Sequence, residues 1–397
     1  MSTSTLQATF SLPADHILRR GPSALLGLGV IGLAVLGAGA LIDREQFFRS
    51  YLVAFMFWGG LAFGSFGLVA LNHIAGGRWG IVIRRICEAA IRTLPLVVVL
   101  FLPILVGMHD LYEWSVPEHI AHDEILQFKA AWYLNPTFFV VRAVIYFTIL
   151  IGFGQLMLRF SLEQDATGNP QTVRSLQMVG RGAIVLYALT MTFASVDWMM
   201  SIEPHWSSTI YGLLVIGGQV LSAFAFAIAI LTLLVEHDPI AQVANAERFH
   251  DLGKMLLAFV MIYAYFAFSQ FLIIWSANIP EETPWYLKRI TGGWIVLAIA
   301  LPLFHFFLPF FVLLSRKLKK NPRRLIIVAL LMLFMRLADL YWMIAPAFSP
   351  GKFVLHWMDI AAVLGVGGVW LAAFLWQLQA RPVLPLRDPA LPLEASA

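Results

Sequence analysis

The chain is poor in cysteine and in charged residues, and each shortage excludes classes of protein. It has one cysteine in 397 residues, Cys87, and therefore cannot form an internal disulfide, ligate an iron–sulfur cluster or carry a haem-attachment motif. We interpret Cys87 as a small buried side chain. Only 13% of the residues are charged, about half the share in a typical soluble domain. A large soluble domain is therefore not expected.

Histidines and short motifs give no sign of a cofactor held by this chain alone. Of ten histidines, His73, His305 and His356 fall within or at the edge of apolar stretches, and no stretch holds two at a separation that brackets a haem. The sequence contains no His-Glu-x-x-His zinc motif and no Gly-x-x-x-x-Gly-Lys phosphate loop. If the chain takes part in redox chemistry, we expect the metal centres to belong to other subunits.

Apolar stretches fill most of the sequence. Residues are 60% hydrophobic, the mean hydropathy is +0.79, and each of ten stretches approaches the roughly 20 residues that a helix needs to cross about 30 Å of hydrocarbon. The sequence therefore predicts an all-α integral membrane protein with one transmembrane domain (22–379) between two tails (1–21 and 380–397). The predicted spans are 22–41, 51–75, 90–107, 137–158, 179–201, 209–235, 252–277, 294–315, 324–346 and 354–379.

The distribution of basic residues predicts an orientation. Of 27 lysines and arginines, 19 fall in tails and loops on the side that holds both termini, 6 fall on the opposite side, and Arg142 and Arg336 lie inside spans. By the positive-inside rule, both tails are expected to be cytoplasmic. The densest basic loop, 316–324, fits this topology and contact with anionic lipid, so a pI near 9.2 does not call for nucleic acid. Because no small-residue cleavage site follows the first apolar run, we expect the first helix to be retained.

Asp197 is the first of several ionisable residues placed in apolar stretches, where a charge without a partner costs several kcal/mol. It lies about one turn from the non-cytoplasmic end of the fifth span. Two interpretations are open: a solvated residue at the helix end, or part of a polar pocket that faces the periplasm. We interpret the neighbouring Trp198 and Trp206 as anchors at the membrane surface, where tryptophan is enriched.

Two other spans carry ionisable residues near mid-membrane. Arg336 and Asp339 are three residues apart and therefore share a helix face. They form either an internal ion pair or a proton-handling site, and the sequence leaves both open. His305 lies between Pro302 and Pro309, which remove backbone donors and are expected to bend the helix. His305 is either a hydrogen-bonded core residue or part of a proton path.

Further candidates lie at helix ends. Asp359 joins Asp197, His305, Arg336 and Asp339 as a leading candidate for a quinone pocket or proton path. Five residues carry lower weight: four at or entering spans from the periplasmic side, and Lys254, which we expect to extend to the cytoplasmic face. The four are His109, Asp110, Arg142 and His356. Gln219 and Gln270 are interpreted either as interhelical hydrogen-bonding residues or as lining of a water path.

Several long runs of sequence together resemble one family. The two sharpest are FASVDW at 193–198 followed by EPHWSSTIYG at 203–212, and HDLGK at 250–254 followed by AFSQFLIIWS at 267–276; GGRWG at 76–80 and FLPI at 101–104 add to them. These runs resemble the second large membrane subunit, ActF, of bacterial alternative complex III, a quinol:cytochrome c oxidoreductase. That family belongs to the wider NrfD/PsrC group of polysulfide-reductase membrane subunits. The resemblance extends from about residue 20 to 383.

The resemblance implies an architecture, a location and partners. It implies ten helices as two four-helix bundles plus two peripheral helices, with both termini cytoplasmic, in the bacterial inner membrane. The implied partners are a sister NrfD-like membrane subunit, a periplasmic iron–sulfur subunit, c-type cytochrome subunits and small membrane subunits. The implied cofactors are quinol or quinone at the membrane subunits, and haem c and iron–sulfur clusters in the partner subunits.

The sequence therefore predicts a membrane subunit of a quinol-oxidising respiratory complex that contributes to quinol-linked electron transfer and to proton translocation. Asp339 and His305 would relay protons near mid-membrane, while Asp197 and Asp359 face the periplasm. Two alternatives remain open. One is a structural subunit with no quinone site of its own, and the other is a secondary transporter, which would need broken helices in matching halves.

Overall fold

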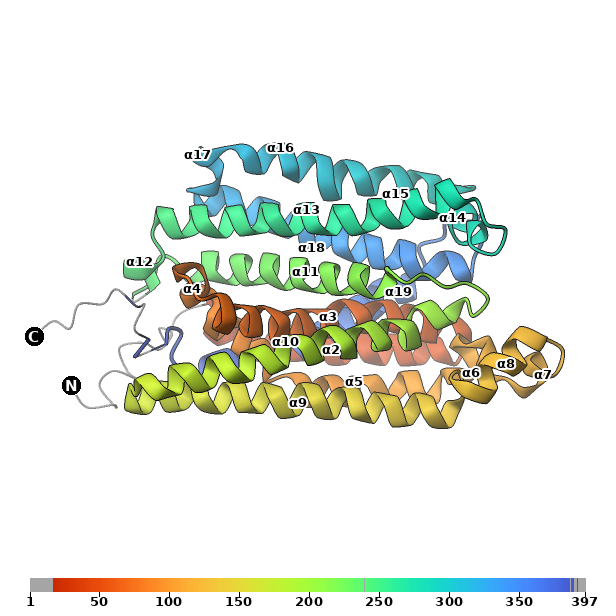
Figure 1. Ribbon diagram of the computed structural model, residues 1–397, viewed down its shortest axis with the longest axis horizontal. Helices are drawn as coiled ribbons and strands as arrows, with labels where there is room; N and C mark the ends of the chain where they lie inside the picture. The colour runs from red at the N-terminus through yellow and green to blue at the C-terminus, as the bar shows by residue number, and fades with distance from the viewer. Residues whose placement is uncertain (1–16, 239, 386, 389–390, 392–397) are drawn as a thin grey trace, which may run out of the picture.

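Long helices aligned along one axis make up almost all of the described chain (Figure 1). The computed structural model describes residues 17–238, 240–385, 387–388 and 391, so most of the predicted N-terminal tail and the end of the C-terminal tail lie outside the described residues. Within these ranges nine helices are long and apolar enough to cross a membrane, and one bent helix pair makes a tenth. The same ranges contain no strand. An all-α, multi-pass membrane protein is confirmed.

The spanning helices follow the predicted order. They are α2 (Ile17–Ala40), α3 (Arg44–Ala75), α9 (Pro136–Thr167), α10 (Pro170–Trp198), α11 (Tyr211–Leu234), α13 (Ala246–Ala277), the run α15–η3–α16 (Trp294–Leu301, Pro302–Phe307, Leu308–Leu314), α18 (Pro322–Ile344) and α19 (Trp357–Gln379). Short helices lie between them: α6 (Met108–Leu111), α7 (Pro117–Ala121), α8 (Glu124–Trp132), α12 (Ile240–Val243), α14 (Thr283–Ile290) and α17 (Arg316–Lys319). Three-residue 3₁₀ turns occur at Glu113–Ser115 (η1), Met200–Ile202 (η2) and Ala345–Ala347 (η4).

Capping residues, rather than the edges of apolar runs, set the helix ends. The side chains of Asn135, Asn169 and Asn321 each accept a hydrogen bond from a backbone N–H of the first turn, and each is followed by a proline at the first helical position. Gly168, with φ of 65°, ends α9 in the left-handed conformation that glycine adopts without strain. For this reason α9 runs to Thr167, although the apolar stretch predicts an end at 158.

The third predicted span needs correction. The predicted stretch 90–107 covers only α5 (Leu94–Val106), which is too short to cross a membrane alone. The preceding α4 (Arg78–Ile91) forms a bent pair with α5, with an angle of 45° between them. Because α4 carries three buried charged residues, its mean hydropathy is low and the sequence places it in a loop.

The helical bundle has two ends of opposite charge. We call the end that carries α4, α12 and α17 the basic end; there α2 begins and α19 ends (Figure 1). The opposite end carries α6, α7, α8 and α14 and is called the acidic end, since it holds more carboxylates than cations. Successive spanning helices run between these two ends in alternating direction.

Two helices form the centre and several others face outward. The most apolar windows of α3 and α11 are 94% and 89% buried, whereas those of α13 and α15–α16 are only 22% and 17% buried. α2 lies along α19, where a Cβ atom on Gly32 would stand 2.7 Å from Gly365 Cα, so glycine permits a close contact between the two helices. The outward faces are those that meet lipid or other chains.

Candidate functional site

The structure brings Asp197 together with two residues of α9 at the acidic end. Arg142 donates from Nε and Nη2 to the two carboxylate oxygens of Asp197, each at 2.8 Å, and the Tyr146 hydroxyl donates to Oδ2 at 2.7 Å. Asp197 is fully buried. We call Asp197, Arg142 and Tyr146 the first cluster. Bidentate pairing of this kind fixes the position of a buried carboxylate. It also offsets much of the desolvation penalty, because the carboxylate oxygens accept hydrogen bonds.

A second cluster of the same composition lies deeper in the molecule. Arg336 donates from Nη1 to Asp339 Oδ2, and the Tyr263 hydroxyl donates to the same oxygen. All three side chains are buried. The predicted ion pair between Arg336 and Asp339 is therefore present, and Tyr263 of α13 adds a donor that sequence reasoning missed. We call Asp339, Arg336 and Tyr263 the second cluster.

His305 faces the second cluster from an irregular part of its helix. Pro302 begins a π-helical segment that ends at Phe307, consistent with the irregularity predicted from the flanking prolines. The His305 ring centroid lies 4.8 Å from that of Tyr263. Its Nε2 is buried and has no hydrogen-bond partner among the described residues. A ring nitrogen in that state can accept or donate a proton once a partner arrives.

A cavity of about 210 Å³ opens beside the first cluster. It is lined by residues from α8, from the chain before α9, from the end of α10 and from the segment that follows α10: Lys129, Tyr133, Leu134, Val196, Met200, Ser201, Pro204, Trp206 and Ser207. Tyr133 connects the cavity to the cluster, because Arg142 Nη1 donates to its carbonyl at 2.9 Å and the guanidinium lies 3.8 Å from the centre of its ring. We call this cavity the acidic-end pocket.

The polar groups of the acidic-end pocket include several hydrogen-bond donors. The Trp206 indole N–H is buried and finds no acceptor in the described part of the chain, while Lys129 donates to the Pro204 carbonyl. Burial lowers the pKa of Lys129, and burial together with Asp197 raises the pKa of the Tyr133 hydroxyl, which therefore keeps its proton. Donors in a mostly apolar cavity fit a small, flat ligand that offers carbonyl or hydroxyl oxygens.

Two expectations for this region are wrong. Trp198 and Trp206 are not anchors at the membrane surface, since they are 1% and 5% exposed. The Trp198 ring lies among Phe101, Phe147 and other aromatic rings of the core, and Trp206 stacks on Trp285 at 4.7 Å. The alternative of a solvated helix-end residue for Asp197 is also wrong, because its carboxylate is buried.

Asp359 has a structural explanation. Its carboxylate accepts from the His356 backbone N–H at 2.8 Å and forms a capping box with His356 at the start of α19. Ser50 also donates to it at 2.6 Å and Tyr341 at 3.2 Å. The candidates His356 and Asp359 therefore meet, and their contact fixes the start of a helix.

The other candidates are dispersed. Asp110 pairs with Arg44 at 3.1 Å, and His109 contacts Ser115 at 3.1 Å. Lys254 is largely exposed at the basic end, beside Asp251. None of these three contacts either cluster. Gln219 accepts from Tyr187 between helices, Gln270 contacts Ser208, and Cys87 is buried as expected.

Sequence reasoning missed two buried charge clusters. At the basic end, Arg85 of α4 pairs with Glu88 at 2.6 Å and with Asp165 of α9. At the acidic end, Arg289 is 1% exposed and pairs with Glu203 at 2.7 Å. Burial lowers the pKa of Arg289, while Glu203 acts in the opposite direction. The i,i+3 spacing of Arg85 and Glu88 was the only available signal.

In the ranges that the structure describes, no three His, Cys, Asp or Glu side chains come together as metal ligands. No protein-family model matches the chain, and no curated protein matches it.

Proposed function

We propose that this chain is a membrane subunit of a quinol:cytochrome c oxidoreductase complex and that the acidic-end pocket receives the quinol head group. The resemblance of the sequence to the ActF family supports the complex, and the observation that carries the head-group site is a pocket with several hydrogen-bond donors beside a buried carboxylate. Quinone oxygens are acceptors, and a quinol must lose protons when it is oxidised. Lys129 and Trp206 would hold the oxygens, and the pocket volume of about 210 Å³ admits one substituted ring.

The first cluster would take part in proton release. The Tyr133 side chain lines the pocket, and its ring lies against the Arg142 guanidinium that pairs with Asp197. A proton that leaves the ligand therefore has a short route to the Asp197 carboxylate through Tyr133 and Tyr146. Arg142 would keep the carboxylate oriented. Electrons would pass to iron–sulfur clusters and haem c in partner subunits.

The second cluster would relay protons deeper in the bilayer. From its ion pair with Arg336, Asp339 would accept a proton in transit and pass it on; Tyr263 donates a hydrogen bond to its carboxylate, and His305 lies in ring contact with Tyr263. The π-helical turn places an unpartnered ring nitrogen next to this group. Such an arrangement supports proton translocation coupled to quinol oxidation, as we expect from intramembrane ionisable groups.

We infer that both tails are cytoplasmic, because the basic end carries most of the lysines and arginines. The resemblance implies the inner membrane of a bacterium. In this orientation the acidic-end pocket faces the periplasm. Following the resemblance, we group α3, α4–α5, α9 and α10 as one four-helix bundle and α11, α13, α15–α16 and α18 as a second, with α2 and α19 peripheral; α3 and α11 pack against each other between the two groups. Each bundle then contains one Asp–Arg–Tyr cluster. The partners would be a sister NrfD-like subunit, an iron–sulfur subunit, c-type cytochromes and small membrane subunits.

The first test is a mild-detergent pull-down of the tagged chain, followed by a visible spectrum with and without quinol. A co-purifying c-type haem band that quinol reduces is expected. A colourless preparation of this chain alone would refute the proposed complex. The pocket is tested in the same preparation with a photoreactive quinone, which should label residues 129–134 or 196–207.

Matched variants separate binding from assembly. Trp206→Phe removes one unpartnered donor and keeps the aromatic stack on Trp285, so quinone labelling should fall while the haem content stays constant. The control variant Lys254→Met changes an exposed lysine at the opposite end of the bundle, so its labelling by the photoreactive quinone should equal that of the parent. Equal labelling of the Trp206→Phe variant and the parent would place the quinone elsewhere and favour a structural subunit.

One observation favours a second candidate, a secondary transporter. Transporter sites are often built from broken helices, and two spans here are interrupted: α4–α5 at its 45° bend and α15–α16 at the π-helical turn. A transporter would purify alone or as a homo-oligomer without haem, so the same pull-down separates the two functions.

A further inference from the structure

The loop at the basic end that joins α16 to α18 carries more positive charge than its surroundings neutralise. Residues 316–324 contain six lysines and arginines and no carboxylate. Two of the six have acidic partners: Lys320 pairs with Glu247, and Arg323 pairs with Glu236 at 2.8 Å. No carboxylate of the described residues forms an ion pair with the other four, which are Arg316, Lys317, Lys319 and Arg324. Burial, and then the nearby Lys254, lower the pKa of Lys319.

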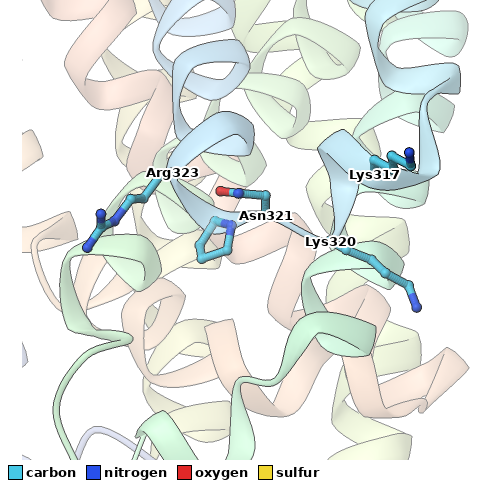
Figure 2. Close-up of a pocket in the computed structure, with 5 residues that line it drawn as sticks. Lys317, Lys320, Asn321 and Arg323 are labelled. Carbon is cyan, nitrogen blue, oxygen red and sulfur yellow. The ribbon is translucent and has the colours of Figure 1, made fainter.

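A shallow surface cavity of about 440 Å³, wide open to its surroundings, lies along this loop. It is lined by Lys317, Lys320, Asn321, Pro322 and Arg323. Figure 2 shows Arg323 on one side of Asn321, and Lys317 and Lys320 on the other. The cations therefore stand on both sides of a central polar residue. Arg323 and its partner are exposed, and pairs of that kind contribute little, so its guanidinium is available to another anion.

Exposed apolar side chains continue from the loop along both helices that it joins. Phe311 and Leu314 of α16 are exposed, as are Ile327 and Leu330 of α18. A free phosphate ion makes no favourable contact with these apolar side chains, whereas an acyl chain packs against them. Cations at the end of a helix pair with apolar residues beside them match an amphiphile whose head group is anionic.

We propose that this cavity binds an anionic phospholipid with two phosphate groups, of the cardiolipin type. One phosphate would lie by Lys317 and the other by Arg323, with the acyl chains against the exposed residues of α16 and α18. The site lies at the opposite end of the bundle from the acidic-end pocket. It does not depend on the proposed quinol function.

The test measures the affinity of the purified, detergent-solubilised full chain, with any subunits that accompany it, for fluorescent cardiolipin. The variant K317Q/R323Q removes one cation on each side of Asn321. The control R174Q/R181Q removes two exposed arginines from α10 at the same end. We expect the dissociation constant to rise roughly thirtyfold for K317Q/R323Q and to stay within about twofold for the control.

Other outcomes overturn the proposal in distinct ways. Equal weakening in the variant and the control would mean that cardiolipin responds only to overall charge. Binding of inorganic pyrophosphate as tight as that of cardiolipin would assign the cavity to a soluble phosphate ligand. Equal affinity for cardiolipin and phosphatidylethanolamine would exclude a site for anionic lipid. Should K317Q/R323Q fail to fold, Lys317→Gln alone serves, because Lys317 is exposed and pairs with no carboxylate of the described ranges that its loss would strand.

Discussion

Replacing Arg336 alone should destabilise the protein far more than replacing Arg336 and Asp339 together. Both side chains are at least 94% buried, and the Asp339 carboxylate has two donors, Arg336 and Tyr263. Arg336→Met leaves a buried carboxylate with only the Tyr263 hydroxyl, and loss of one partner of a buried pair costs about 3–5 kcal/mol. The double variant R336M/D339L removes the stranded charge. It leaves only the Tyr263 hydroxyl without an acceptor, at about 1–3 kcal/mol.

Cys87 provides the assay for these variants. It is the only cysteine in the chain and is 2% exposed, so a thiol-reactive dye labels it only when the surrounding core opens. If labelling follows opening, Arg336→Met should react roughly 100-fold to 4,000-fold faster than the parent in detergent. R336M/D339L should react more slowly than the single variant. Arg324→Met, at the exposed start of the same helix, should change the opening free energy by less than about 0.5 kcal/mol.

The comparison is decisive because the two variants share the loss of Arg336. Equal labelling of Arg336→Met and R336M/D339L would show that the stranded carboxylate carries no penalty. In that case Asp339 would be neutral in the native protein or reached by water. The claim that the second cluster is a closed ion pair would then be wrong.

Three further predictions concern function, packing and pH. Asp339→Asn should lower the number of protons moved per electron in an assembled, haem-containing complex; an unchanged ratio would remove Asp339 from the proton path. Gly64→Ala places a Cβ 2.0 Å from the Gln219 carbonyl oxygen, so it should lower the free energy of unfolding by about 1–3 kcal/mol or more. Gly60→Ala is the control, because the nearest atom to a Cβ there is 3.6 Å away and alanine should be tolerated. Thermal unfolding of both variants checks the difference. The backbone N–H of Leu126, and then His205, hold the pKa of the Asp123 carboxyl below its usual value. The ionised carboxylate caps the start of α8, so this stabilisation is fully present above the unfolded pKa of about 3.9. It is lost as the pH falls through the lower pKa of the folded state. Protease cleavage in α8 should therefore rise below about pH 4, and it should be high at all pH in the Asp123→Ala variant.

The sequence predicts contacts well when they lie within one helix. Arg336 and Asp339 are three residues apart, so their pairing follows from helical periodicity alone. Arg142 and Asp197 lie 55 positions apart on different helices, and both were candidates without any sign that they meet. Their pairing depends on how α9 packs against α10, which periodicity does not specify. Tyr146 and Tyr263 gave no signal, because a tyrosine in an apolar stretch has the same pattern whether or not its hydroxyl binds a carboxylate.

Hydropathy failed to identify α4 as part of a spanning helix pair, because α4 buries charged side chains as well as apolar ones. Arg85 and Glu88 lower the mean hydropathy of α4, yet they neutralise each other inside the protein. The prediction that Trp198 and Trp206 are anchors at the membrane surface failed for a related reason. A tryptophan near a helix end is enriched at membrane surfaces, but Trp198 fills a space between aromatic rings of neighbouring helices. In both cases a partner distant in sequence decides the environment.

Hydrogen bonding alone does not separate functional carboxylates from structural ones. Asp359 is as well hydrogen-bonded as Asp197, since it caps α19 and accepts from Ser50 and Tyr341. The difference lies in the neighbouring groups. Asp197 adjoins a pocket with the indole N–H of Trp206, and the second cluster adjoins Nε2 of His305; neither atom has a hydrogen-bond partner among the described residues. A buried polar atom without a partner costs free energy, which a ligand or a proton would recover by supplying the partner. We therefore propose functional roles for Asp197 and His305, while Asp359 caps a helix.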